Sequence, residues 1–65
     1  MKLLLNGEAV EVEAATLADL LEHAGFGGAK VATAVNGSFV AASARAGHVL
    51  APDDRIEVLA PMQGG

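Results

Sequence analysis

The sequence predicts an α+β fold in which a mixed β-sheet is covered on one face by a single amphipathic helix. Two features support this prediction. Asparagine–glycine pairs occur twice, each between short apolar stretches, and such pairs are the strongest short-range signal for a β-hairpin. Between the two pairs, leucines recur at the spacing of one helix face. With 65 residues, the chain is long enough for one domain only.

The first hairpin is predicted over residues 2–13. Residues 2–6 are largely apolar and end at Asn6-Gly7, where a tight turn fits. Residues 8–13 then alternate, with Val10 and Val12 on one face and glutamates on the other. Two antiparallel strands with one buried face follow from this pattern.

The helix is predicted to begin after Thr16, a favourable N-cap, with Asp19 completing a shortened capping box. Gly25 lies where a left-handed C-cap belongs, and Phe26 is expected to fold back over the last turn. The apolar face consists of residues spaced by three or four positions, namely Leu17, Leu20, Leu21 and Ala24.

A second hairpin is predicted after the helix. Residues 31–36 are apolar and partly β-branched, and they end in the second pair, Asn36-Gly37. Residues 38–40 are expected to return as a short strand. Residues 41–47 show too little pattern to predict more than a loop or a short turn.

The last strand is predicted over residues 55–59, with Ile56 and Val58 on one face. Residues 48–50 are a candidate for one more extended piece, and Pro52-Asp53-Asp54 is typical of a turn. Laying the first and last strands side by side, in parallel, gives the β-grasp, or ubiquitin-like, arrangement. The predicted core is Leu3, Leu5, Val10, Val12, Leu17, Leu20, Leu21, Val35, Ile56 and Val58.

Composition argues against several functions. Eight acidic residues against four scattered basic ones give a net charge of −4, which does not suit a nucleic-acid partner. No apolar run approaches the roughly 20 residues that span a bilayer. We therefore expect a cytoplasmic protein that binds neither nucleic acid nor membrane.

Residues suited to catalysis or metal binding are scarce. The two histidines, His23 and His48, have no cysteine partner and no ligand spacing, so we expect no bound metal or cofactor and no enzyme active site. What remains is the α-carboxylate of Gly65. We expect a β-grasp domain over residues 1–60, followed by a flexible tail over 61–65 that is thin enough to enter a narrow enzyme channel.

Over its whole length the sequence resembles the ThiS family, the sulfur carriers of thiamine thiazole biosynthesis. The resemblance rests on Asn6-Gly7 after the first strand, the helix start at residues 16–21 and the hairpin over 35–40. It continues through residues 53–58 to the terminal Gly64-Gly65. Members of this family often carry Asp-Gly-Asp before the last strand, where this chain has Pro52-Asp53-Asp54; the change keeps a turn.

The resemblance implies a protein cosubstrate rather than an enzyme. A ThiF-like enzyme would adenylate the Gly65 carboxylate with ATP and Mg²⁺ and, with sulfur from a cysteine desulfurase system, convert it to a thiocarboxylate. A ThiG-like thiazole synthase would then accept the sulfur. Two alternatives stay open: a related carrier for molybdopterin, cysteine or another thiolated metabolite, and a ubiquitin-like binding or modifier module.

A carrier must also dock on its partners. Strand alternation places Leu4 and Leu59 on the sheet face opposite the helix, where parallel pairing would make them neighbours, joined by Phe39 or Val40. The acidic balance favours a basic partner face. The tail residues expected to contact the partner are Met62, Gln63, Gly64 and Gly65.

Overall fold

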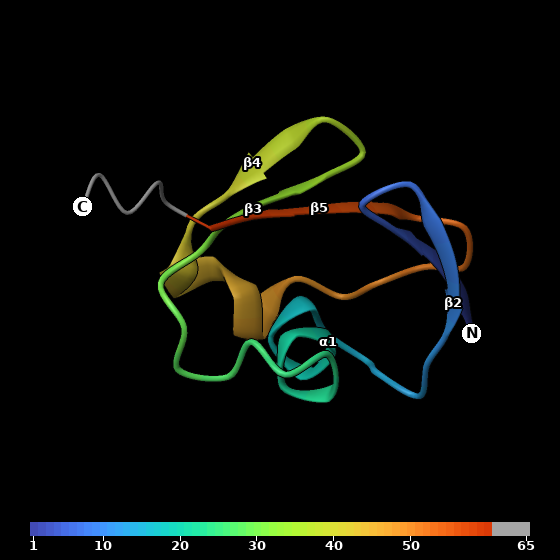
Figure 1. The fold of residues 1–65 in the computed structure, drawn as a ribbon, viewed down its shortest axis with the longest axis horizontal. Helices are drawn as coiled ribbons and strands as arrows, with labels where there is room; N and C mark the ends of the chain where they lie inside the picture. The colour runs from blue at the N-terminus through green and yellow to red at the C-terminus, as the bar shows by residue number, and fades with distance from the viewer. Residues whose placement is uncertain (61–65) are drawn as a thin grey trace.

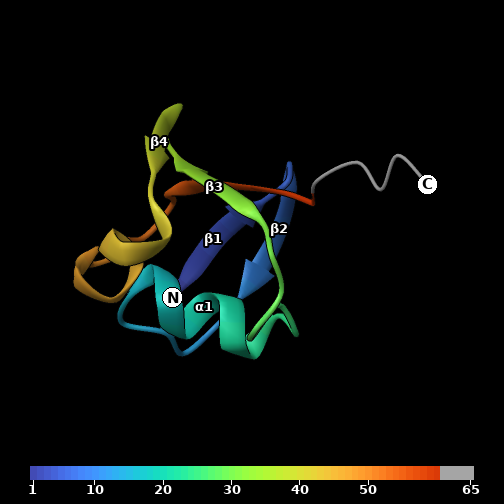
Figure 2. The same cartoon turned by 90° about the vertical axis from the view of Figure 1, so that its left-hand side faces the viewer.

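The computed structural model describes residues 1–60, which form a five-stranded mixed sheet with its helices on one face (Figures 1 and 2). The strand order is β2-β1-β5-β3-β4. This arrangement confirms the predicted α+β, β-grasp fold. The residues of the predicted tail, 61–65, lie outside the described part of the chain. The elements are β1 (Lys2–Leu5), β2 (Glu8–Glu11), α1 (Leu17–His23), β3 (Ala32–Val35), β4 (Ser38–Val40), η1, a 3-10 helix (Ala42–Gly47), and β5 (Arg55–Leu59).

Both hairpins form as predicted, and each turns through an Asn-Gly pair. Asn6 and Gly7 have φ angles of 51° and 83°, and Asn36 and Gly37 have 52° and 86°. Two successive positive φ angles define the type I′ turn, whose twist matches that of the flanking strands. The strands on either side of each turn pair antiparallel.

Strand β5 lies in the middle of the sheet, because it pairs with β1 on one side and β3 on the other. The pairing with β1 is parallel and sets Leu5 opposite Ile56, and the pairing with β3 is antiparallel and sets Val35 opposite Ile56. The prediction that the first and last strands lie side by side is therefore confirmed. Ile56 is only 1% exposed.

The N-terminal end of α1 is held by the predicted capping box. The backbone N–H of Asp19 donates to the Thr16 hydroxyl, and the backbone N–H of Thr16 donates to the Asp19 carboxylate, both at 3.2 Å. Two backbone donors that the helix cannot satisfy internally thereby gain partners.

The helix ends at His23 with a complete Schellman motif. Gly25, with φ at 88°, donates its N–H to the Glu22 carbonyl at 3.2 Å, and Phe26 donates to the Leu21 carbonyl at 2.8 Å. The aromatic ring of Phe26 packs against the core, as predicted. The prediction that Ala24 continues the apolar face is wrong. Ala24 is the exposed C-cap residue, because the chain has already begun to leave the helix there.

The segment after the second hairpin packs beside α1 rather than joining the sheet. The weakly patterned residues 41–47 contain the 3-10 helix η1. The extended piece expected at residues 48–50 is reduced to a single bridge between Val49 and Thr16. Leu50, which follows, is 4% exposed and belongs to the core.

The core confirms most of the prediction and adds four residues to it. Leu5, Val10 and Val12 pack against the core but are only partly buried. Seven predicted residues are buried, and they are Leu3, Leu17, Leu20, Leu21, Val35, Ile56 and Val58. The buried residues that were not predicted are Ala14, Thr33, Val40 and Leu50.

Thr33 is the buried polar residue of this core. Its hydroxyl donates to the Val40 carbonyl at 2.7 Å and accepts from Nε of Arg45 at 3.0 Å. Arg45 also donates to the carbonyl of Val31. These bonds join η1 to the second hairpin and satisfy groups that would be costly to bury unpaired.

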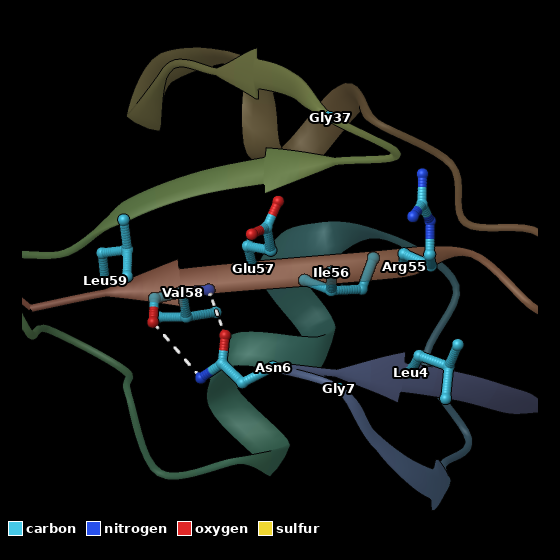
Figure 3. Close-up of a pocket in the computed structure, with 9 residues that line it drawn as sticks. All are labelled: Leu4, Asn6, Gly7, Gly37, Arg55, Ile56, Glu57, Val58 and Leu59. Atoms are coloured by element: carbon cyan, nitrogen blue, oxygen red, sulfur yellow. Dashed lines mark hydrogen bonds between the residues drawn. The ribbon is translucent and has the colours of Figure 1, made fainter.

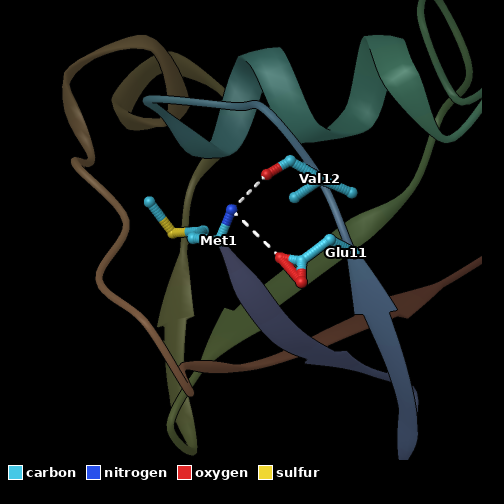
Figure 4. A network of polar contacts seen from close by, with 3 residues as sticks. All are labelled: Met1, Glu11 and Val12. Atoms are coloured by element: carbon cyan, nitrogen blue, oxygen red, sulfur yellow. Dashed lines mark hydrogen bonds and ion pairs between the residues drawn. The ribbon is translucent and has the colours of Figure 1, made fainter.

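The start of the chain is tied to the end of β2. The α-ammonium group of Met1 donates to the Val12 carbonyl at 2.6 Å and lies 3.3 Å from a carboxylate oxygen of Glu11 (Figure 4). The strand predicted to reach residue 13 ends at Glu11, although the N–H of Val12 still donates to the Met1 carbonyl at 2.9 Å.

Candidate functional site

The candidate site begins at the end of β5, the strand that leads to the C-terminal residues. Val58 is buried, Leu59 is 67% exposed, and Ala60 is exposed. The sequence continues past Ala60 to Gly65, which the sequence predicts to be the reactive residue. The contacts that hold β5 therefore decide where the segment after Ala60 starts.

Asn6 holds β5 from the β1 side near the end of the strand. Its backbone N–H donates to the Ile56 carbonyl at 2.8 Å. Its side-chain Oδ1 accepts from the Val58 N–H at 2.8 Å, and Nδ2 donates to the Val58 carbonyl at 3.3 Å (Figure 3). Both backbone groups of Val58 thus gain a partner from one carboxamide.

Asn36 holds β5 from the β3 side, at the start of the strand. Its N–H donates to the Arg55 carbonyl at 2.7 Å, and its Oδ1 accepts from the Arg55 N–H at 2.9 Å. The sequence predicted both asparagines as turn residues but did not predict that their side chains hydrogen-bond the backbone of β5. The only available signal is that Asn stands at both turns, where Asp or Gly would also fit the backbone.

Asp54 extends the contacts of Asn36. Its Oδ1 accepts from Nδ2 of Asn36 at 3.0 Å, and its Oδ2 accepts from the Ala51 N–H at 2.9 Å. The bond from Ala51 and then that from Asn36 hold the pKa of this carboxyl below its usual value of 3.8. Asp53, with φ at 70°, and the bond from the Asp54 N–H to the Ala51 carbonyl confirm the turn predicted here.

The sheet face opposite the helix carries the predicted docking residues, with two corrections. Leu4 and Leu59 are not neighbours, because the register places Leu4 opposite Arg55, four residues before Leu59. Val40 is buried at 7% exposure on the helix side, so of the two alternatives only Phe39, 73% exposed, lies on the outer face.

Leu59 and Phe39 belong to one exposed apolar patch, which we call the outer patch. Leu59 lies opposite Ala32, and Phe39 lies opposite Ala34. All four line a common groove, together with Thr33 and Glu57. The outer patch therefore spans β5, β3 and β4 near the point where β5 ends.

A larger pocket of about 510 Å³ lies between the turn of the first hairpin and β5 (Figure 3). Leu4 and Leu59 line it from different strands, and Arg55 and Glu57 contribute the charged side chains along β5. The two leucines thus line the same pocket, although they are not opposite each other in the sheet. The remaining lining residues are Asn6, Gly7, Gly37, Ile56 and Val58.

Neither histidine lines this pocket. His23 is exposed in the last turn of α1, and His48 follows η1 and donates its N–H to the Arg45 carbonyl at 3.2 Å. Within residues 1–60, no group of three or more His, Cys, Asp or Glu residues is placed to hold a metal ion. No helix in this range is long and apolar enough to cross a membrane.

The five-stranded mixed sheet with its helices on one face places the chain among proteins with the ubiquitin-like, or β-grasp, fold. Within that class, the chain belongs to the ThiS family, whose model matches residues 3–65. It is similar to the crystal structure of the thiamine biosynthesis protein ThiS from Geobacter metallireducens. The TM-score is 0.84 at 28% identity, with all of both chains covered. A comparison with curated protein sequences gives no match.

Proposed function

We propose that this protein is a sulfur carrier of thiamine biosynthesis, with the sulfur held on the C-terminal carboxyl group of Gly65. The observation that supports this most is the match to the ThiS family, which extends through Gly65 itself. The similar structure from Geobacter metallireducens, described as a thiamine biosynthesis protein, supports the same pathway. On this proposal the chain is a cosubstrate of its partner enzymes and not a catalyst.

The chemistry takes two steps. The Gly65 carboxylate attacks the α-phosphorus of ATP, pyrophosphate leaves, and an acyl adenylate forms. Hydrosulfide, or an enzyme-bound equivalent that a thiol reduces to that level, then attacks the acyl carbon, and AMP leaves. The product is a thiocarboxylate. Because the chain has no cysteine, it offers no side-chain thiol to carry sulfur, which leaves the terminus as the carrier group.

The partners follow from this sequence of steps. A ThiF-like enzyme would bind ATP and Mg²⁺, so neither belongs to this chain. A cysteine desulfurase system would supply the sulfur, and a ThiG-like thiazole synthase would accept it. Glycine at positions 64 and 65 suits entry into a narrow channel, because a Cβ would widen the chain and restrict φ.

The outer patch is the surface that we propose docks on the adenylating enzyme. Leu59 and Phe39 are exposed next to the end of β5, so a partner that covers them is close to the segment that carries Gly65. Leu4, at the other side of the larger pocket, would widen that contact. Met62 and Gln63 would contact the partner on the way to its active site.

The experiment that tests this proposal is an intact-mass measurement. The protein is incubated with ATP, a sulfur donor and extract of its native host. We expect a gain in mass equal to the replacement of one oxygen by sulfur, no gain after deletion of Gly65, and a slower gain for Gly65→Ala. A carrier already known to be charged in the same extract serves as the control.

Failure to gain mass in such an extract would contradict the proposal. An amide bond to lysines of other proteins would instead show a modifier. If the charged protein gives its sulfur to the large subunit of molybdopterin synthase and not to a thiazole synthase, the carrier chemistry is right but the thiamine pathway is wrong.

A further inference from the structure

The parallel ladder between β1 and β5 stops before β5 ends. Its successive bonds run from the Leu4 N–H to the Asp54 carbonyl at 3.0 Å and from the Asn6 N–H to the Ile56 carbonyl at 2.8 Å. The next residue of β5 that faces β1 is Val58. The chain has turned away at Asn6-Gly7 by then, so β1 offers no backbone group to Val58.

The carboxamide of Asn6 takes the place of the missing backbone. A carboxamide has the same donor and acceptor as a peptide group, and here it meets both the N–H and the carbonyl of Val58. The ladder is extended by one rung, within two residues of Ala60. On the opposite side β5 is held by β3, where Leu59 lies opposite Ala32.

We propose that Asn6 is a positioning residue: it fixes the end of β5 and thereby the direction in which the chain leaves the sheet toward Gly65. The catalytic use of that direction rests on the proposed carrier function. An adenylating enzyme that is docked on the outer patch receives the terminal segment at a defined place, and loss of the last rung lets the start of that segment move. Small displacements of a reacting group lower the rate of reaction more than they lower binding.

The side-chain chemistry gives a graded set of variants. Asn6→Gly keeps the positive φ of the turn and removes both bonds to Val58. Asn6→Asp also tolerates that φ and still accepts from the Val58 N–H. Its second carboxylate oxygen has no hydrogen to donate, so the bond to the Val58 carbonyl is lost and two acceptors face each other. Asn36→Gly is the matched control, because it also keeps a positive φ and removes two side-chain bonds at the other end of β5, one from the Arg55 N–H and one to the Asp54 carboxylate.

The test combines amide hydrogen exchange with the kinetics of ATP–pyrophosphate exchange by the purified ThiF-type enzyme of the same organism. In Asn6→Gly we expect the hydrogen-exchange rate of the Val58 amide to rise about tenfold relative to that of the Arg55 amide. In Asn36→Gly we expect the rate of the Arg55 amide to rise about tenfold relative to that of the Val58 amide. We expect kcat to fall about tenfold in Asn6→Gly with KM within about twofold, and both to stay within about twofold in Asn36→Gly. For Asn6→Asp, both the exchange rate at the Val58 amide and kcat should lie between the values for wild type and for Asn6→Gly.

Equal kinetic losses in Asn6→Gly and Asn36→Gly would overturn the proposal, since both would then reflect general stability. So would a raised KM with unchanged kcat, which would make Asn6 a docking residue, or no change at all. If Asn6→Gly does not fold, Asn6→Asp carries the comparison. If the wild-type chain is not adenylated, the proposed carrier function is wrong. Hydrogen exchange at the Val58 amide then still shows whether Asn6 fixes the end of β5.

Discussion

At the scale of single residues, two asparagines and one aspartate link the hairpins to the central strand. Asn6 and Asn36 use their backbones to turn the chain and their side chains to hold β5. Asp54 connects the turn before β5 to Asn36 and accepts two hydrogen bonds as a carboxylate. Because its pKa is lowered in the folded chain, this carboxylate links stability to pH.

We predict that Asp54→Asn reduces the loss of stability in acid. The contribution of Asp54 is fully present above its unfolded pKa, near 4, and is lost as pH falls through the lower folded pKa. Protonated His48 favours the ionised form. Urea unfolding from pH 6 down to pH 2.5 should therefore show the wild type and the variant converging at low pH.

Asp53→Asn is the control for this prediction, because it removes a charge from the same turn and leaves the bonds of Asp54 intact. If both variants change the pH dependence equally, net charge and not the hydrogen bonds of Asp54 is responsible.

At the scale of elements, α1 is a seven-residue helix whose ends are defined by local contacts. So short a helix is not stable alone, and its caps and its buried leucines hold it in place. The capping box and the Schellman motif were readable in the sequence because each depends on residues only three to five positions apart.

We predict that Gly25→Ala lowers the free energy of unfolding by about 1–2 kcal/mol, because an L side chain is disfavoured at φ of 88°. A Cβ there would meet no other part of the molecule within 4 Å, so the cost comes from the local backbone conformation and not from packing against neighbouring residues. Gly47→Ala is the matched control, since its site is equally open and needs no positive φ. We expect it to stay within about 0.5 kcal/mol of wild type in urea unfolding. Equal effects at both positions would contradict this explanation.

At the scale of the whole molecule, the sheet has one face in the core and one face open. The helix side buries Ile56 and Val58, and the open side carries the outer patch next to the end of β5. An exposed apolar patch of this kind is typical of a protein that docks on a partner.

We predict that the double variant Leu59→Ser with Phe39→Ser weakens binding to the ThiF-type enzyme by about tenfold or more. Val49→Ser is the control, because Val49 is equally exposed, at 74%, but lies in the segment that contacts the start of α1. Titration calorimetry with the purified enzyme measures both. If Val49→Ser weakens binding as much as the double variant, or neither does, the outer patch is not the docking surface.

The sequence by itself determined the elements whose signals are local. The Asn-Gly turns, the capped helix and the alternating strands follow from contacts between near neighbours, and the β-grasp arrangement was predicted from which strand faces must be buried. The terminal glycines, which motivate the carrier function, are likewise visible in sequence alone.

Only the tertiary structure decided features that depend on distant segments meeting. Leu4 and Leu59 are separated because the register of β1 on β5 is set by the whole sheet, and no local pattern encodes it. Val40 is buried because it pairs with Thr33 over the core, and residues 48–50 leave the sheet because they pack beside the helix. Asn6 and Val58 are 52 positions apart in the sequence. The Asn6 side chain, which the sequence identifies only as part of a turn, therefore hydrogen-bonds the end of the central strand only in the folded chain.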